Sequence, residues 1–180
     1  MRYKPLGSTG LHVSKISLGT VELGIDYGFP GTDQYQKPDE AQAIRLLHRS
    51  VDLGINLFDT HRDYGVSEQL IGRAMVQMTE RPYIASKVTL PPDPGYTGVF
   101  PPPPDPGLSP PDMRRAILGS IEASLTAVRV DTIDLMQVHN TTMASLERDD
   151  IIACLQEARD QGKIRFIGAS AYGRDVPMRS

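Results

Sequence analysis

Residues 57–65 read LFDTHRDYG, and the rest of the chain is best understood from this stretch. Two apolar residues lead into Asp59, and Tyr64 follows five positions later, just before a glycine. The apolar pair indicates the end of a buried strand, and Gly65 indicates a turn. Asp59 and Tyr64 are therefore expected where a strand gives way to a loop. A tyrosine acts as an acid near neutral pH only if a neighbouring cation lowers its pKa from about 10.

The composition is that of one soluble domain spanning residues 1–180. Apolar residues make up 39% and charged residues 23% of the chain, and the formal net charge is −3. This balance disfavours nucleic acid and anionic membranes as partners. No run approaches the roughly 20 apolar residues of a membrane span, so a cytoplasmic protein is expected. The single cysteine, Cys154, lies in an apolar helical pattern and is expected to be a buried, inert thiol.

Strand-like and helix-like segments alternate along the chain after an N-terminal hairpin expected over residues 3–13. The segments from 21 to 38 and from 172 to 180 carry no helical or strand pattern. Helical periodicity runs over residues 38–54, 67–78, 111–128 and 146–160. Short apolar runs that predict strands lie at residues 16–20, 55–58, 83–86, 133–138 and 164–168.

The strands are apolar throughout, which is typical of a parallel sheet buried on both faces. Two α/β architectures fit this pattern: a doubly wound open sheet and a (β/α)8 TIM-type barrel. The first strand is not followed by a Gly-x-Gly-x-x-Gly sequence, which weakens the dinucleotide-binding, doubly wound interpretation. A complete barrel takes about 250 residues. With about five strands and four helices, this chain would form an incomplete (β/α)8 TIM-type barrel if that architecture is the right one.

Residues 91–111 hold ten of the fifteen prolines. That density excludes a helix or a central strand. A surface linker and a substrate-side lid or specificity loop both remain open interpretations.

Polar residues gather where the predicted strands end. Asp59, Lys87, His139 and Ser170 each close an apolar run, and Tyr64 lies in the loop after the second buried strand. Taken singly, each has a structural explanation, such as a solvated lysine, a hydrogen-bonded histidine or a turn aspartate. Because parallel strands end on one face, the set is expected to converge. Together these side chains could add a hydride and a proton to a carbonyl group. No metal site is expected, because the four histidines lack ligand spacing.

Seven segments carry a resemblance to a known family. The chain resembles the N-terminal part of an aldo-keto reductase, in the order in which that family has the same segments, over residues 1 to about 171. This resemblance implies a (β/α)8 barrel with a hairpin at its bottom, and binding of NADPH or, less often, NADH. The matching segments are residues 6–14, 16–20, 54–60, 64–68, 85–88, 131–135 and 162–170.

The resemblance also implies roles for individual residues. Tyr64 would be the general acid, and Lys87 with Asp59 would lower its pKa. His139 would orient the substrate carbonyl, with Asn140 as a further substrate contact. The residues expected near the cofactor are Gly19, Thr20, Asp59 and Ser170.

Three departures from the family pattern matter. A small residue usually follows Asp-Thr, whereas this chain has His61, which is predicted to narrow or charge the substrate cleft. Ala171 stands where an asparagine usually follows the serine. The segments of the last three family strands have no counterpart here. A partner chain that covers the open barrel edges is therefore one expectation, and a non-catalytic aldo-keto-reductase-like protein is the alternative to a carbonyl reductase.

Overall fold

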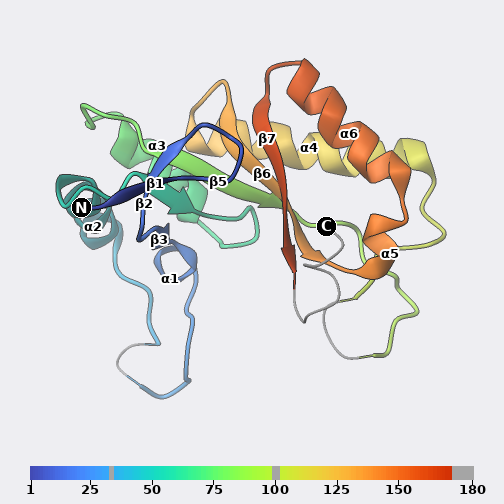
Figure 1. Ribbon diagram of the computed structural model, residues 1–180. Coiled ribbons are helices and arrows are strands. Elements are labelled where there is room, and N and C mark those ends of the chain that lie inside the picture. Colours follow the sequence, from blue (N-terminus) through green and yellow to red (C-terminus); the bar gives the residue numbers. More distant parts are fainter. Residues whose placement is uncertain (33–34, 99–101, 172–180) are drawn as a thin grey trace.

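The computed structural model describes residues 1–32, 35–98 and 102–171. Its centre is a parallel sheet whose strands follow one another in space in the order of the chain (Figure 1). Each strand pairs with its predecessor, so every connection is a crossover through a helix or loop. The five strands are β3 (Leu18–Gly19), β4 (Leu57–Asp59), β5 (Tyr83–Val88), β6 (Ile133–Thr141) and β7 (Ile164–Ala171).

A separate antiparallel hairpin precedes the sheet, formed by β1 (Tyr3–Pro5) and β2 (His12–Ser14). It docks on the segment that leads into β4. Asn56 accepts a hydrogen bond from the Ser14 amide at 2.7 Å and donates to the His12 carbonyl at 2.9 Å. The Tyr3 hydroxyl donates to the carbonyl of Gly54 at 3.0 Å. The expected hairpin is confirmed, and it covers the end of the sheet at which the strands begin.

Four long helices pack side by side in chain order against the sheet. The buried core between them consists of aliphatic side chains such as Leu47, Ile71, Ile117 and Leu155. This single layer of consecutive helices on a parallel sheet is that of an incomplete (β/α)8 barrel, as expected. Among the described residues, no helix is both long and apolar enough to cross a membrane. The long helices are α2 (Glu40–Asp52), α3 (Ser67–Met75), α4 (Pro110–Val128) and α6 (Asp149–Asp160).

Local sequence signals set where these helices begin. Asp39 and Gln42 form a reciprocal capping box at the start of α2. Ser109 caps α4, and proline follows directly in the first turn, where its missing amide hydrogen costs nothing. Within α3, Gly72 allows close packing, because a Cβ there would lie 2.5 Å from the carbonyl oxygen of Ala127.

Several predicted boundaries were wrong. The loop expected over residues 21–38 begins with a short helix, α1 (Val21–Gly24). The helix expected over residues 146–160 begins three residues later, as α6, and an unexpected short helix, α5 (Met143–Leu146), starts before it at a Thr142 capping box. Strands β5, β6 and β7 run two or three residues further than expected. Lys87, His139 and Ser170 therefore lie on strands instead of after them.

The proline-rich segment closes on itself at its base. Pro92 and Pro104 form an antiparallel bridge, and the Asp105 amide donates to the carbonyl of Pro91 at 2.9 Å. Arg148, just before α6, donates to the carbonyls of Asp105 at 2.9 Å and Leu108 at 3.2 Å. The described part of the segment is thus anchored to the helix layer, and its role as linker or lid stays a prediction. The predicted patternless tail, residues 172–180, lies outside the described residues.

Candidate active site

The centre of the site is an ion pair between neighbouring strand ends. Asp59 is the last residue of β4, and Lys87 lies near the end of β5. The Lys87 Nζ donates to Asp59 Oδ1 at 2.6 Å and to the carbonyl oxygen of Thr60 at 2.9 Å. The Lys87 side chain is only 6% exposed, whereas that of Asp59 is 38% exposed. The ammonium is therefore held by two acceptors inside the sheet, with the carboxylate facing the opening.

Tyr64 lies beside this ammonium. The Lys87 Nζ is 5.2 Å from the centroid of the Tyr64 ring. A turn in which the Tyr64 amide donates to the His61 carbonyl at 3.0 Å gives the loop its shape. Helix α1 packs directly against this loop, since a Cβ at Gly24 would lie 1.7 Å from the Tyr64 carbonyl oxygen. The structure thus brings together the three residues of the expected acid and its tuning pair.

A buried network of hydroxyl groups fixes the backbone under Asp59. The Thr20 Oγ1 donates to the carbonyl of Asp59 at 2.9 Å and lies 2.7 Å from Ser67 Oγ, which in turn lies 2.8 Å from Thr60 Oγ1. Thr20, Thr60 and Ser67 are all fully buried. The Thr20 hydroxyl, expected near the cofactor, is therefore engaged in holding the end of β4. If Thr20 contacts the cofactor as predicted, it must do so through atoms other than its hydroxyl group.

His139 and Asn140 lie at an irregular part of β6. The register with β7 shifts between Val138 and Thr141. Asn140 has a φ of 53°, a left-handed conformation that asparagine adopts more readily than most residues. Such bulges redirect side chains at the ends of strands. The His139 ring centroid lies 6.3 Å from that of Tyr64. The residues predicted to be the proton donor and the carbonyl-orienting group are thus neighbours.

His61 occupies the space between these two rings. Its ring centroid is 5.1 Å from that of Tyr64 and 4.2 Å from that of His139, and the residue is 1% exposed. Its Nε2 lies 2.8 Å from Thr89 Oγ1, and the same hydroxyl donates to Asp63 Oδ2 at 2.7 Å. His61, which was predicted to contact the substrate, is thus hydrogen-bonded to Thr89, the residue that follows β5.

Burial shifts the pKa values of both histidines downward. Desolvation lowers the pKa of His61 to about 4, with further lowering by His139 and Lys87 and an opposing effect of Asp63. Desolvation and the Lys87 ammonium likewise lower the pKa of His139. Both rings are therefore uncharged near neutral pH. Of the two predictions for His61, this favours a narrowed cleft over a charged one.

The end of β3 offers open space beside the ion pair, and the end of β7 carries a hydroxyl group. Gly19 pairs in register with Asp59, so a Cβ at Gly19 would point to the same side of the sheet as the carboxylate. That Cβ would meet no atom within 4 Å, which leaves open space next to Asp59. Ser170, partly buried at the end of β7, makes no side-chain hydrogen bond to any described residue. An open floor and a hydroxyl donor fit the nicotinamide end of NAD(P)H.

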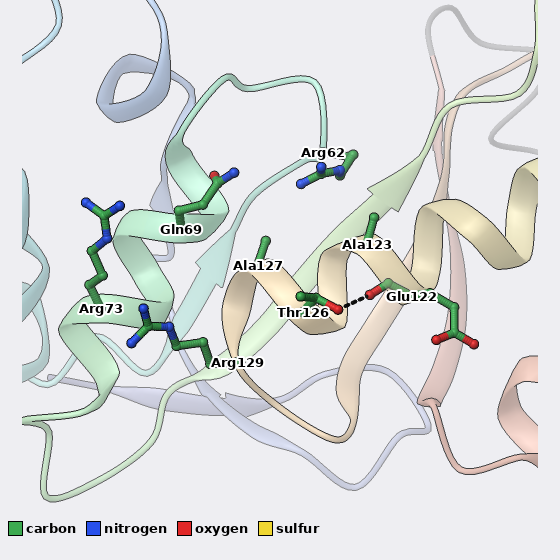
Figure 2. Close-up of a pocket in the computed structure, with 8 residues that line it drawn as sticks. All are labelled: Arg62, Gln69, Arg73, Glu122, Ala123, Thr126, Ala127 and Arg129. Carbon is green, nitrogen blue, oxygen red and sulfur yellow. Dashed lines mark hydrogen bonds between the residues drawn. The ribbon is translucent and has the colours of Figure 1, made fainter.

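A separate pocket of about 470 Å³ lies between α3 and α4, outside the sheet (Figure 2). Figure 2 shows Arg62, Arg73 and Arg129 around it, with Gln69 on α3. Arg62 pairs with the buried Glu68 at 3.5 Å, and Arg73 pairs with Glu40 on α2. None of Asp59, Tyr64, Lys87 and His139 lines this pocket. Arg73 thus joins α3 to α2, and Arg62 joins the loop before α3 to that helix, both away from the site at the strand ends.

Three contributors were missed from the sequence. Thr89 and Asp63 hold His61, and Ser67 links the two threonines beneath Asp59. Thr89 follows Lys87 by two positions, so the alternation of a strand could have placed both on the same face. The part of the chain that the structure describes contains no cluster of three or more His, Cys, Asp or Glu residues that could hold a metal ion.

Comparison with known proteins agrees with this geometry. The model of the Aldo/keto reductase family matches residues 15–177. The chain is 33% identical over 182 residues to the uncharacterized oxidoreductase YrpG of Bacillus subtilis, covering 96% of this chain and 50% of that protein. It is 28% identical over 179 residues to L-galactose dehydrogenase of Arabidopsis thaliana, covering 96% of this chain and 49% of that protein. The chain spans about half the length of these curated relatives.

Solved structures show the same likeness in three dimensions. The holo form of the aldo-keto reductase AKR11C1 from Bacillus halodurans superposes with a TM-score of 0.73 at 29% identity, covering 99% of this chain and 53% of that one. Glycerol dehydrogenase AKR11B4 from Gluconobacter oxydans gives a TM-score of 0.67 at 26% identity, covering 98% and 50%. The family match over most of the chain and the converging strand-end residues lead to one conclusion: this chain belongs to the aldo/keto reductase family.

Proposed function

We propose that the chain takes part in NAD(P)H-dependent oxidoreduction, reducing aldehydes or ketones to alcohols with Tyr64 as the proton donor. The observation that supports this most is the Lys87 ammonium. It is almost fully buried, is held by Asp59 at 2.6 Å, and lies 5.2 Å from the Tyr64 ring. The family match and relatives named as oxidoreductases and dehydrogenases point to the same reaction class.

The roles follow from charge and position. As Tyr64 gives its proton to the carbonyl oxygen, the nearby Lys87 ammonium stabilises the phenolate that forms. Asp59 keeps Lys87 in place, and the threonine and serine hydroxyls beneath keep Asp59 in place. An uncharged His139 donates a hydrogen bond to the same carbonyl oxygen and polarises the carbonyl. A bound NAD(P)H would supply the hydride.

The residues that would hold the cofactor are those at the open ends of β3 and β7. Gly19 would leave space for the nicotinamide, and the Ser170 hydroxyl would bond its carboxamide. NADP(H) is the proposed form by family resemblance, with NAD(H) as the second candidate. The substrate class proposed is a small carbonyl compound, because the space bounded by Tyr64, His139 and His61 is lined by closely spaced rings.

A fluorescence titration of the purified 180-residue chain with NADPH, and separately with NADH, tests the proposal. Saturable binding followed by aldehyde-dependent loss of NADPH absorbance is the expected result. Tyr64→Phe should lower kcat by roughly 10²–10⁴-fold, the usual contribution of a positioned acid. Tyr83→Phe, at the opposite end of β5, is the matched control and should leave kcat unchanged. If neither nucleotide binds, the self-sufficient reductase is excluded and the non-catalytic alternative is favoured.

A further inference from the structure

The proposed carbonyl reduction gives His61 no role, although this residue lies at the centre of the site. Its buried ring lies in contact range of both Tyr64 and His139, at 5.1 Å and 4.2 Å between ring centroids. The two outer rings are 6.3 Å apart. A displacement of the His61 ring would therefore change its packing against both Tyr64 and His139.

The hydrogen bonds around His61 determine which ring nitrogen carries its proton. A carboxylate oxygen has no hydrogen to give, so the Thr89 hydroxyl donates its only hydrogen to Asp63. The Thr89 oxygen can then only accept from His61 Nε2, 2.8 Å away. His61 is uncharged near neutral pH, so it is the Nε2–H tautomer, with a lone pair on Nδ1. We call this hydrogen-bonded chain, Asp63–Thr89–His61, the His61 clip.

The second ring nitrogen of His61, Nδ1, contributes no hydrogen bond to any described residue that could hold the ring in place. His61 Nδ1 is buried and has no hydrogen-bond partner among the described residues. An unsatisfied buried acceptor is unfavourable, and most buried polar atoms in folded proteins have a hydrogen-bond partner. The orientation of the His61 ring is therefore not set by a hydrogen bond at Nδ1. The Nε2 bond to Thr89 and the contacts with Tyr64 and His139 keep it in this orientation.

The clip connects two loops that carry the proposed machinery. Asp63 directly precedes Tyr64, and Thr89 follows Lys87 by two residues. The bonds through Thr89 thus tie the Tyr64 loop (residues 60–66) to the end of β5, independently of the Lys87–Asp59 ion pair.

We propose that His61 is a positioning residue: held by Thr89 and Asp63 as the Nε2–H tautomer, its ring sets the separation of Tyr64 from His139. This role rests on the proposed function of those two residues. It goes beyond a narrowed cleft, because it assigns a tautomer to His61 and a task to Thr89 and Asp63.

The tautomer can be measured without any turnover. Imidazole ¹⁵N chemical shifts of the full chain should show a protonated Nε2 and an unprotonated Nδ1 at His61 near neutral pH. In Asp63→Ala the Thr89 hydrogen is released and can be donated to Nε2, so the Nδ1–H form should rise. An Nδ1–H signature in the unsubstituted chain would overturn the clip.

The positioning role is tested by Thr89→Val, which removes the hydrogen bond from an exposed residue and so leaves folding intact. Ring-to-ring NOEs among His61, Tyr64 and His139 should weaken or change in Thr89→Val and stay unchanged in Thr89→Ser, which restores the hydroxyl. Thr126→Val on α4 is the matched control and should change none of them. Unchanged NOEs in Thr89→Val overturn the positioning role, whether or not the chain is active.

If the purified chain reduces a carbonyl substrate, steady-state kinetics give a second test of the positioning role. Thr89→Val should lower kcat by about 10–100-fold, the effect of a small displacement of reacting groups, while the KM for NADPH stays constant. Thr89→Ser should recover most of kcat. If the chain lacks hydride transfer while the NMR signatures hold, the proposed function fails and the assigned tautomer and ring positions stand. Full activity in Thr89→Val sinks the positioning role alone.

Discussion

Gly24 and Tyr64 are in backbone contact: a Cβ at position 24 would lie 1.7 Å from the Tyr64 carbonyl oxygen. Gly24 also accepts a backbone hydrogen bond from Val66, at 3.5 Å. The short helix α1 is therefore the support on which the Tyr64 loop is built. The conformation of the loop depends on the absence of a side chain at one position forty residues earlier.

Gly24→Ala should therefore displace the Tyr64 loop. The methyl group meets backbone, which cannot turn aside as a flexible side chain can. We expect a loss of about 1–3 kcal/mol in the free energy of unfolding, measured by urea denaturation, and a fall in kcat from displacement of Tyr64.

The control is Gly119→Ala on α4, where a Cβ would meet nothing within 4 Å. Alanine there should raise the free energy of unfolding by about 0.5–1 kcal/mol, because glycine is a poor helix residue. Equal effects of the two substitutions would contradict the contact.

Removing the two partners of the ion pair should have unequal effects on stability. Asp59→Ala leaves a 6%-exposed ammonium with the Thr60 carbonyl as its remaining hydrogen-bond acceptor among the described residues, and we expect a loss of roughly 2–3 kcal/mol. Lys87→Met replaces the cation by an apolar chain of similar length. It leaves the Asp59 carboxylate, whose side chain is 38% exposed to water. That change should cost about 1 kcal/mol or less.

Both variants should nevertheless lose activity, because Lys87→Met removes the charge that stabilises the phenolate and Asp59→Ala removes the carboxylate that holds this charge in place. Urea denaturation and steady-state kinetics on the same preparations separate the two effects. A larger stability loss for Lys87→Met than for Asp59→Ala would show that the lysine is less buried in solution.

Stability should fall as the pH drops below about 6.5. The pKa of His61 is lowered to about 4 in the folded chain, whereas an unfolded histidine titrates near 6.5. Between these values the unfolded state binds more protons, so the free energy of unfolding rises with pH and is lost as the pH falls through this window. The lowered pKa of His139 acts in the same direction.

His61→Gln should flatten this dependence, by an amount on the order of 3 kcal/mol between pH 4 and 7 if His61 alone is removed. Gln is the replacement of choice because its side-chain N–H can still reach toward Thr89. The exposed His12→Gln is the control and should leave the slope unchanged. An unaltered slope in His61→Gln would place the His61 ring in contact with water.

Asp134 lies at the end of the sheet opposite the candidate site, so a substitution there should change stability without changing the catalytic rate. Asp134, near the start of β6, accepts hydrogen bonds from the Ile84 amide at 2.9 Å, from Arg81 at 3.0 Å and from Arg165 at 2.8 Å. It thereby connects β5, β6 and β7. Asp134→Ala should lower the free energy of unfolding by about 2–4 kcal/mol with little change in kcat per folded molecule.

Asp160→Asn, at an exposed ion pair with Arg159, is the matched control and should change stability by less than about 0.5 kcal/mol. Loss of kcat in folded Asp134→Ala molecules would mean that the two ends of the strands are coupled.

Much of this architecture could be predicted from local sequence signals. Uniformly apolar runs identify buried parallel strands, and residues such as Asp39 and Ser109 mark helix starts through their side-chain caps. The convergence of Asp59, Lys87 and His139 follows from the parallel direction of their strands. These features depend on single elements or on one topological rule, so one sequence suffices to predict them.

What could not be predicted depends on contacts between distant segments. The reach of β6 as far as Thr141 requires its neighbour β7, because apolar periodicity ends earlier. Arg148, between α5 and α6, donates hydrogen bonds to the carbonyls of Asp105 and Leu108, about forty residues earlier, and no local pattern predicts these contacts. The resemblance places Thr20 near the cofactor, but its hydroxyl group is engaged beneath the site, with the carbonyl of Asp59 and the hydroxyl of Ser67.

The order of the strands has a consequence for synthesis on the ribosome. Each strand from β4 onward pairs with the one made just before it. Domains fold from the N-terminal side as they emerge, and such nearest-neighbour pairing has low contact order. All residues of the Asp59–Lys87 pair and of the His61 clip have emerged once residue 89 has left the exit tunnel, before the proline-rich segment and β6 emerge. His139 is then the last of the four predicted catalytic residues to reach the site.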